Sequence, residues 1–154
     1  MRHALFHDCT APRRNEQLQP FDHCPVREGT WGAEWYPGLS LPLPDEAVVD
    51  KPSYDGFQDS TLDATLRSLG ARTCLYVGFA SNVCVEATAR HGFVLGYYTV
   101  LVTDATAGDT DLGHRACLQQ WQTYYGPLTT SHALERVWLA TTAPHATVPG
   151  SVGV

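Results

Sequence analysis

The stretch TCLYVGFASNVCVEATARHGFVL, residues 73–95, decides the fold of this chain. Its first part, residues 73–77, is a short apolar run typical of a buried strand, and residues 85–95 have helical spacing. The turn between them places Cys84 at the beginning of a helix. Unpaired backbone N–H groups and the positive end of the helix dipole favour a thiolate at such a position. Cys84 is therefore predicted to be a nucleophile.

Strand and helix alternate on both sides of this stretch. Upstream, Ser60 or Asp59 can cap a helix at 61–69 that Gly70 ends, and Ala47 to Val49 form a predicted short strand before Lys51. Downstream we expect a strand at 97–103, a helix at 111–125, a short strand at 127–130, and a helix at 131–140 with Leu134, Val137 and Trp138 toward the core. Such alternation indicates parallel strands with helices on the faces of the sheet. The predicted fold class is α/β, a three-layer α/β/α arrangement with a mostly parallel, Rossmann-like sheet.

Length and composition predict one domain. With 154 residues and 44% hydrophobic content, the chain can form one real core, which we place at residues 1–140. Residues 1–46 show no periodicity and are predicted to be irregular, and residues 141–154 are expected to be a disordered tail.

The net charge and the cysteine content limit which classes of binding partner and which cellular compartment we expect. The net charge of −6 argues against nucleic acid and against an anionic membrane surface, and no apolar run approaches the roughly 20 residues of a membrane span. Five cysteines without CxxC spacing indicate a reduced, cytoplasmic setting.

Lys51 is the only lysine, against nine arginines. An exception of this kind hints at a compact ammonium with a tunable pKa, although an accidental surface lysine is an equally good interpretation. Lys51 and Cys84 each follow a predicted strand, and ligands of open parallel sheets bind beyond the carboxyl ends of the strands. Both side chains are therefore expected in one crevice, with Asp104 farther along the same edge.

A thiol at this position can attack a carbonyl carbon, and the backbone N–H groups of Ala80 and Cys84 can hold the resulting oxyanion. A nearby ammonium would stabilise the developing negative charge. The sequence offers no convincing general base, because Asp50 is expected to face away from Lys51 and no histidine stands at a motif-like position.

Four spaced blocks resemble the isochorismatase-like cysteine hydrolase family over roughly residues 29–130. These blocks are GTWGAE at 29–34, VDKPSYDGF at 49–57, the residues 78–87, and DAT at 104–106. The resemblance implies a three-layer fold with a parallel sheet and a catalytic Asp, Lys and Cys. It assigns Lys51 and Cys84 to two of these roles and implies a cis peptide bond between Phe79 and Ala80.

The family's aspartate-bearing first strand, with the helix after it, is missing from the sequence pattern. We therefore expect an N-terminally truncated member, with Asp8 and Asp22 as chance substitutes for the aspartate. Some members bind a metal through Asp and His, and His3, His7, Asp8, Asp22 and His23 are suitable types, yet their spacing departs from the family's and we favour no metal and no cofactor. Homo-oligomers are common in the family and are expected here.

The cysteine and the aromatic blocks look most like the ureidoacrylate and N-carbamoyl amidohydrolase branch. This resemblance implies a small amide or ureide as substrate, with Trp31, Tyr54, Phe57 and Asn82 as contacts. The aromatic residues can equally well only cover the sheet. Three hypotheses follow: a cysteine amidohydrolase, a non-catalytic binding or subunit-interface module, and an incomplete fragment that does not fold alone.

Overall fold

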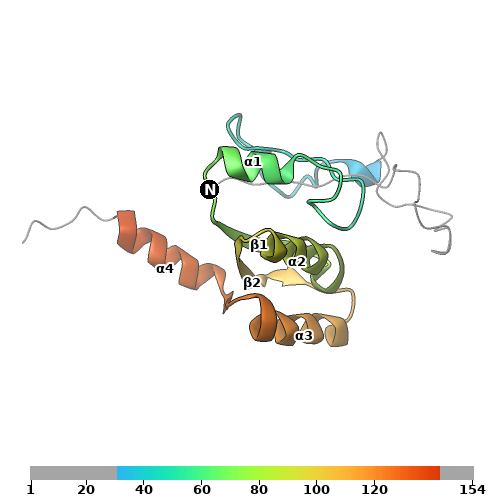
Figure 1. Cartoon of the computed structure of the whole chain (residues 1–154), viewed down its shortest axis with the longest axis vertical. Coiled ribbons are helices and arrows are strands. Elements are labelled where there is room, and N and C mark those ends of the chain that lie inside the picture. The colour runs from blue at the N-terminus through green and yellow to red at the C-terminus, as the bar shows by residue number, and fades with distance from the viewer. Residues whose placement is uncertain (1–30, 143–154) are drawn as a thin grey trace, which may run out of the picture.

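The structure, a computed structural model, describes residues 31–142 (Figure 1). Four α-helices and three strands follow one another in these residues: α1 (Leu62–Ser68), β1 (Thr73–Phe79), α2 (Glu86–Val94), β2 (Tyr98–Ala107), α3 (Asp111–Gln120), β3 (Leu128–Thr129) and α4 (Ser131–Thr142). A 3-10 turn η1 (Trp31–Ala33) precedes them, and π-helical turns η2 (Ser81–Val85) and η3 (Trp121–Tyr125) adjoin α2 and α3. The predicted alternation of strands and helices is confirmed.

The described strands form a parallel sheet in the order β1-β2-β3. Thr73 pairs with Tyr98 and Tyr76 with Leu101, after which the register shifts so that Gly78 pairs with Thr106. β3 continues the ladder on the far side of β2, where Leu101 pairs with Leu128. The α/β fold class with a parallel sheet is therefore confirmed.

Two hydrophobic clusters hold these layers together. The first joins α2 and α3 to one face of the sheet through Val85, Ala89, Leu101, Cys117 and Trp121. The second lies under α1 and contains Val49, Phe57, Leu62 and Tyr97. The second cluster fixes the chain on either side of Lys51 to the rest of the domain.

The helix predicted at 61–69 ends as expected. Gly70 has a φ of +64°, a conformation that glycine adopts at little cost, and its N–H donates to the Arg67 carbonyl at 3.0 Å. At the other end, the Ser60 hydroxyl accepts the Leu62 N–H at 3.1 Å. The N-cap residue is Thr61, one position after the predicted Ser60, yet the Ser60 side chain still satisfies a free N–H of the first turn.

Two predictions about elements were wrong. Residues 47–49 form no strand, because no neighbouring strand in the described chain pairs with them, although Val49 is 1% exposed. The helix predicted at 111–125 is confirmed in its bounds: it is α-helical to Gln120 and continues as the π-helical turn η3 to Tyr125.

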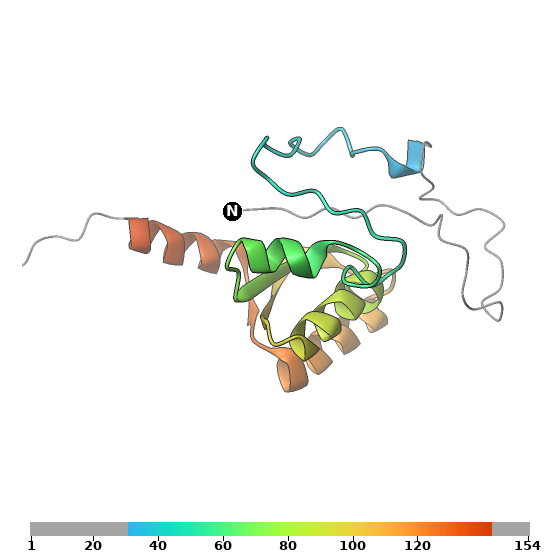
Figure 2. The ribbon, with the colours of Figure 1, turned by 45° about the horizontal axis from the view of Figure 1, so that its top comes forward.

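The second error concerns α4. Val137 and Trp138 are 59% and 42% exposed rather than turned toward the core. Ser131, at the beginning of α4, is bonded to Asp104 of β2, and the helix then runs away from the sheet (Figures 1 and 2). The helical spacing correctly predicted that these residues of α4 share one apolar face, but it did not predict that this face would be exposed rather than packed on the core. In residues 31–142, no helix is both long and apolar enough to cross a membrane.

Candidate active site

Cys84 lies in the turn η2, directly beyond the carboxyl end of β1. The peptide bond between Phe79 and Ala80 is cis, as the family resemblance implied. The Ala80 carbonyl then accepts the N–H groups of Val83 and Val85 at 3.1 and 3.3 Å, which closes the wide first turn. Cys84 is half-buried in this turn, at the entrance of a helix.

Helix α3 holds the same turn from the other side. Ser81 Oγ lies 2.9 Å from His114 Nδ1, and the Cys117 thiol donates to the Ser81 carbonyl at 3.3 Å. The Asn82 amide packs against Gly113, where an added Cβ would come within 2.7 Å of Asn82 Nδ2. Asn82, predicted to contact substrate, therefore lies against the beginning of α3, and no described group bonds its buried Oδ1.

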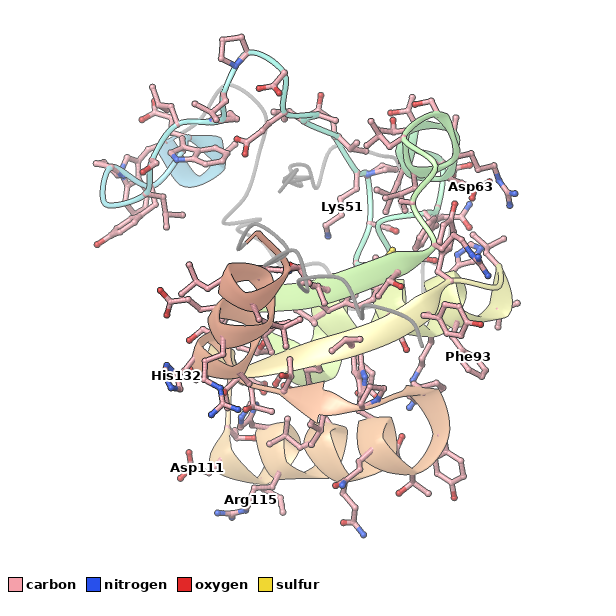
Figure 3. All side chains as sticks on the ribbon, turned by 90° about the vertical axis from the view of Figure 1, so that its left-hand side faces the viewer. Lys51, Asp63, Phe93, Asp111, Arg115 and His132 are labelled. Atoms are coloured by element: carbon pink, nitrogen blue, oxygen red, sulfur yellow. The ribbon has the colours of Figure 1, made fainter. Side chains whose placement is uncertain are left out.

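Lys51 is half-buried, on the segment that passes over the strands, and its side chain points toward the sheet (Figure 3). Its ammonium donates to the carbonyls of Ser53 and Tyr54 at 2.6 and 3.3 Å. Burial lowers the pKa of Lys51, while the charges of Cys84 and then Asp55 act in the opposite direction. Lys51 and Cys84 are thus within electrostatic range of each other, so the structure brings the two predicted catalytic side chains together.

Two side chains of α2 connect the Lys51 segment to the helix that follows Cys84. The buried Thr88 hydroxyl accepts the Gly56 N–H at 2.8 Å and donates to the Cys84 carbonyl, also at 2.8 Å. One turn later, His91 Nδ1 lies 2.6 Å from Asp55 Oδ2. Sequence reasoning missed these residues because the partners lie more than thirty positions apart and no local pattern signals them.

The predicted aromatic contacts lie in different environments. Trp31 is 87% exposed in η1, on an arm that extends from the body (Figure 2). Phe57 is 8% exposed and packs in the cluster under α1, as the sheet-covering interpretation expects. Tyr54 is 53% exposed, and its carbonyl accepts the Lys51 ammonium. Tyr54 is thus the predicted aromatic contact with a direct link to Lys51.

The predicted carboxylates have separate positions. Both oxygens of Asp104 accept hydrogen bonds from Ser131, which hold its pKa below the usual range and tie α4 to β2. Asp50 is exposed next to Lys51. Asp8 and Asp22 lie outside the described residues.

Within residues 31–142, no group of three or more His, Cys, Asp or Glu side chains is arranged to hold a metal ion. The other ligand types considered from the sequence, His3, His7 and His23, also lie outside the described residues.

Comparison with known proteins gives consistent matches. The family model described as "Isochorismatase domain" matches residues 4–133. Ureidoacrylate amidohydrolase RutB of Methylobacterium radiotolerans is 38% identical over 126 residues, which are 80% of this chain and 45% of that protein.

Solved structures agree with this match. An isochorismatase-like hydrolase from Alkaliphilus metalliredigens superposes with a TM-score of 0.69 and 30% identity, covering 73% of this chain and 62% of that one. N-carbamoylsarcosine amidase from Thermoplasma acidophilum gives a TM-score of 0.62 and 27% identity over 68% of this chain and 59% of that one. The chain thus spans about half the length of the curated relative and somewhat more of each solved structure.

Proposed function

The chain belongs to the isochorismatase family, and from this premise we propose that it is a cysteine amidohydrolase that cleaves a C–N amide or ureide bond of a small molecule. The observation that carries the proposal is the half-buried thiol of Cys84 at the entrance of a helix, with the ammonium of Lys51 within electrostatic range. A cation and a helix N-terminus both favour the thiolate, which is the nucleophilic form of cysteine.

In the proposed reaction, Cys84 Sγ attacks the carbonyl carbon and the carbonyl oxygen becomes an oxyanion. The N–H groups of Ala80 and Cys84 hold this oxyanion, and Lys51 stabilises its charge. Collapse breaks the C–N bond, and the amine leaves with a proton. For an amide, water then hydrolyses the thioester to a carboxylic acid and the free thiol. For a ureide, water hydrolyses the corresponding thiocarbamate to the free thiol and a carbamic acid, which releases ammonia and carbon dioxide. A general base must carry the proton between thiol, amine and water; Asp8 and Asp22 remain predictions for that role.

The substrate class follows from the relatives. RutB is a ureidoacrylate amidohydrolase, and a solved relative is an N-carbamoylsarcosine amidase. Both names describe small molecules with a ureido group, so we propose a ureide or amide of this size. Trp31, Tyr54, Phe57 and Asn82 are the proposed contacts of this substrate.

The test combines turnover with trapping of the intermediate. Purified protein is incubated with ureidoacrylate, N-carbamoyl amino acids and nicotinamide, and ammonia release is measured alongside intact-mass spectrometry for an acyl adduct. Cys84→Ala should abolish both signals, while Cys74→Ala, at a half-buried cysteine of β1, should leave them unchanged. A folded protein that releases no ammonia and forms no adduct on Cys84 with any of these substrates would contradict the proposal.

A second function is favoured by a specific feature of the site: no catalytic aspartate is identified beside Cys84 in residues 31–142. The chain would then be a non-catalytic binding or subunit-interface module. Calorimetry in which a ureide binds stoichiometrically, without ammonia release, would favour this function over the first. A cooperative thermal melt by circular dichroism is the prerequisite for either, because an incomplete fragment would show none.

Compartment and assembly are part of the same proposal. Cys84 must remain a free thiol, so we place the protein in a reduced compartment, the cytoplasm. We also propose a homo-oligomer, and light scattering coupled to size-exclusion chromatography reads its mass directly.

A further inference from the structure

Asp55 uses both of its carboxylate oxygens within a small cluster. Oδ2 lies 2.6 Å from His91 Nδ1, and Oδ1 accepts the Phe57 N–H at 2.9 Å. The Phe57 ring packs against the His91 ring with 5.3 Å between centroids. Phe57 is itself buried, so packing restricts the arrangement of Asp55, Phe57 and His91.

This cluster lies on the segment that carries Lys51. The ammonium of Lys51 donates to two carbonyls of its own segment, Ser53 and Tyr54, so its position follows that of the segment. Residues 51–57 form neither helix nor strand, so no ladder of backbone hydrogen bonds holds them. Their place on α2 depends on side chains, among them the Asp55–His91 pair, the Thr88 hydroxyl and the buried Phe57.

The charges around Lys51 give Asp55 a second role. Lys51 is half-buried, and burial disfavours an ammonium. The charge of Asp55 opposes that effect, as does the thiolate form of Cys84. Asp55 is thus a carboxylate that supports the charged lysine whether or not Cys84 is ionised.

We propose that Asp55 and His91 are positioning residues: His91 orients the Asp55 carboxylate, which holds the segment 51–57 on α2 and serves as the counter-ion of the Lys51 ammonium beside Cys84. The catalytic meaning of this arrangement rests on the proposed amidohydrolase function. The arrangement itself is measurable without turnover, so failure of one is distinguishable from failure of the other.

The first test uses the fact that Lys51 is the only lysine in the chain. Protein made without a lysine-containing tag and labelled with [ε-13C]lysine gives one lysine Cε resonance, whose pH titration reports the Lys51 ammonium. Asp55 raises the pKa of Lys51, so Asp55→Asn should shift the titration midpoint to lower pH. The charge-matched control is Asp111→Asn on α3, which lies on the far side of the sheet from Lys51 (Figure 3). A midpoint in Asp55→Asn equal to that of the wild type and of the control would overturn the proposal.

The second test separates the hydrogen bond of His91 from its ring. His91→Asn keeps a donor at the position of Nδ1, whereas His91→Phe keeps a ring against Phe57 and removes the donor. The measured quantity is the rate of Cys84 alkylation by iodoacetamide at neutral pH, resolved by peptide mass spectrometry. Burial raises the pKa of Cys74, and raises that of Cys117 to about 12, so neither should react at a comparable rate.

The expected result is slower alkylation of Cys84 in His91→Phe and a rate near that of the wild type in His91→Asn. Slower alkylation would indicate that the Lys51 ammonium has moved away from the Cys84 sulfur, because a nearby cation favours the reactive thiolate. A purely structural role of His91 predicts the opposite, since loosening the segment would expose Cys84 and speed its reaction. Equal rates in the two variants, or faster alkylation in His91→Phe, would overturn the proposal, even where Asp55→Asn does not fold.

Discussion

Replacing Thr88 by Val should loosen the Lys51 segment without changing the shape of the core. Thr88 is 5% exposed, and Val has nearly the same volume. Its hydroxyl has a single proton, and of the two neighbouring carbonyls Cys84 at 2.8 Å is a better acceptor than Tyr54 at 3.4 Å. The hydroxyl oxygen accepts the Gly56 N–H at 2.8 Å, and this is the bond whose loss matters most.

The magnitude follows from what each partner retains. The Cys84 carbonyl lies within a helix and can keep a backbone partner, but the Gly56 N–H would be left buried and unpaired, at a cost of about 1–3 kcal/mol. Burying a methyl group in place of the hydroxyl recovers up to about 1 kcal/mol. The net loss of stability is therefore about 1–2 kcal/mol, or roughly 2–8 °C in Tm for a chain of this length.

Global stability alone does not isolate the hydrogen bond from the Gly56 N–H to the Thr88 hydroxyl. The control Thr88→Ser keeps this bond but also loses stability, because it removes a buried methyl group worth about 0.5–1.5 kcal/mol. The decisive assay is amide hydrogen exchange at Gly56, followed by NMR together with urea denaturation of each variant. Thr88→Val should raise exchange at Gly56 well beyond its change in global stability, whereas Thr88→Ser should not. Unchanged protection of Gly56 in Thr88→Val would refute the reasoning that this hydroxyl holds the Lys51 segment.

Three further predictions concern the frame around the site. Trp121 is fully buried, and its ring packs edge-on against that of Tyr76 with 5.3 Å between centroids. Trp121→Ala should therefore lower the free energy of unfolding, measured by urea denaturation, by about 3–5 kcal/mol. A loss smaller than that of Trp121→Phe would contradict this prediction. Gly126→Ala would bring Cβ into contact with the Thr99 carbonyl oxygen and should lower Tm more than Gly70→Ala, which meets open space but must keep φ +64° at a cost of about 1–2 kcal/mol. A hydrogen bond from Arg67, and then one from Tyr97, holds the pKa of Asp63 below its ordinary value near 3.8, so its stabilisation is present above that pH and is lost as the pH falls through the lowered value. The stability difference between wild type and Asp63→Asn should therefore shrink below about pH 4, and a difference independent of pH would contradict the assignment.

The fold was predictable wherever local signals agree. The apolar run of β1, the helical spacing after Cys84 and the glycine after α1 each indicate one element and one boundary, and the structure confirms them. Prediction failed where the outcome depends on a distant partner. Val49 is buried, but no strand within residues 31–142 pairs with residues 47–49, and the apolar face of α4 has the spacing of a core helix although Val137 and Trp138 are largely exposed.

The site divides in the same way. The position of Cys84 could be predicted because it follows β1 at the carboxyl edge of a parallel sheet. Lys51 was expected at the same edge after a strand at 47–49 that does not form, so for Lys51 only the family resemblance supports the prediction. Asp55, Thr88 and His91 could not be predicted, because their roles arise from bonds across 32 to 36 positions. Nothing in the sequence around His91 distinguishes a surface helix residue from the partner of Asp55.

Helix α2 connects the two predicted catalytic side chains physically. Cys84 lies in the turn from which α2 extends, and the same helix holds the Lys51 segment through Thr88 and His91, one turn apart. Any movement of α2 relative to β1 therefore carries Cys84 and the Lys51 segment together, so their separation is protected from motions that would separate two independent loops. Gly92, next to His91, shows how tightly this helix is seated, because an added Cβ would come into contact with the Tyr76 hydroxyl of β1 and, at 3.1 Å, the Phe57 ring. A side chain at that position must displace either the strand below Cys84 or the segment beside Lys51, so Gly92 favours the close approach of both.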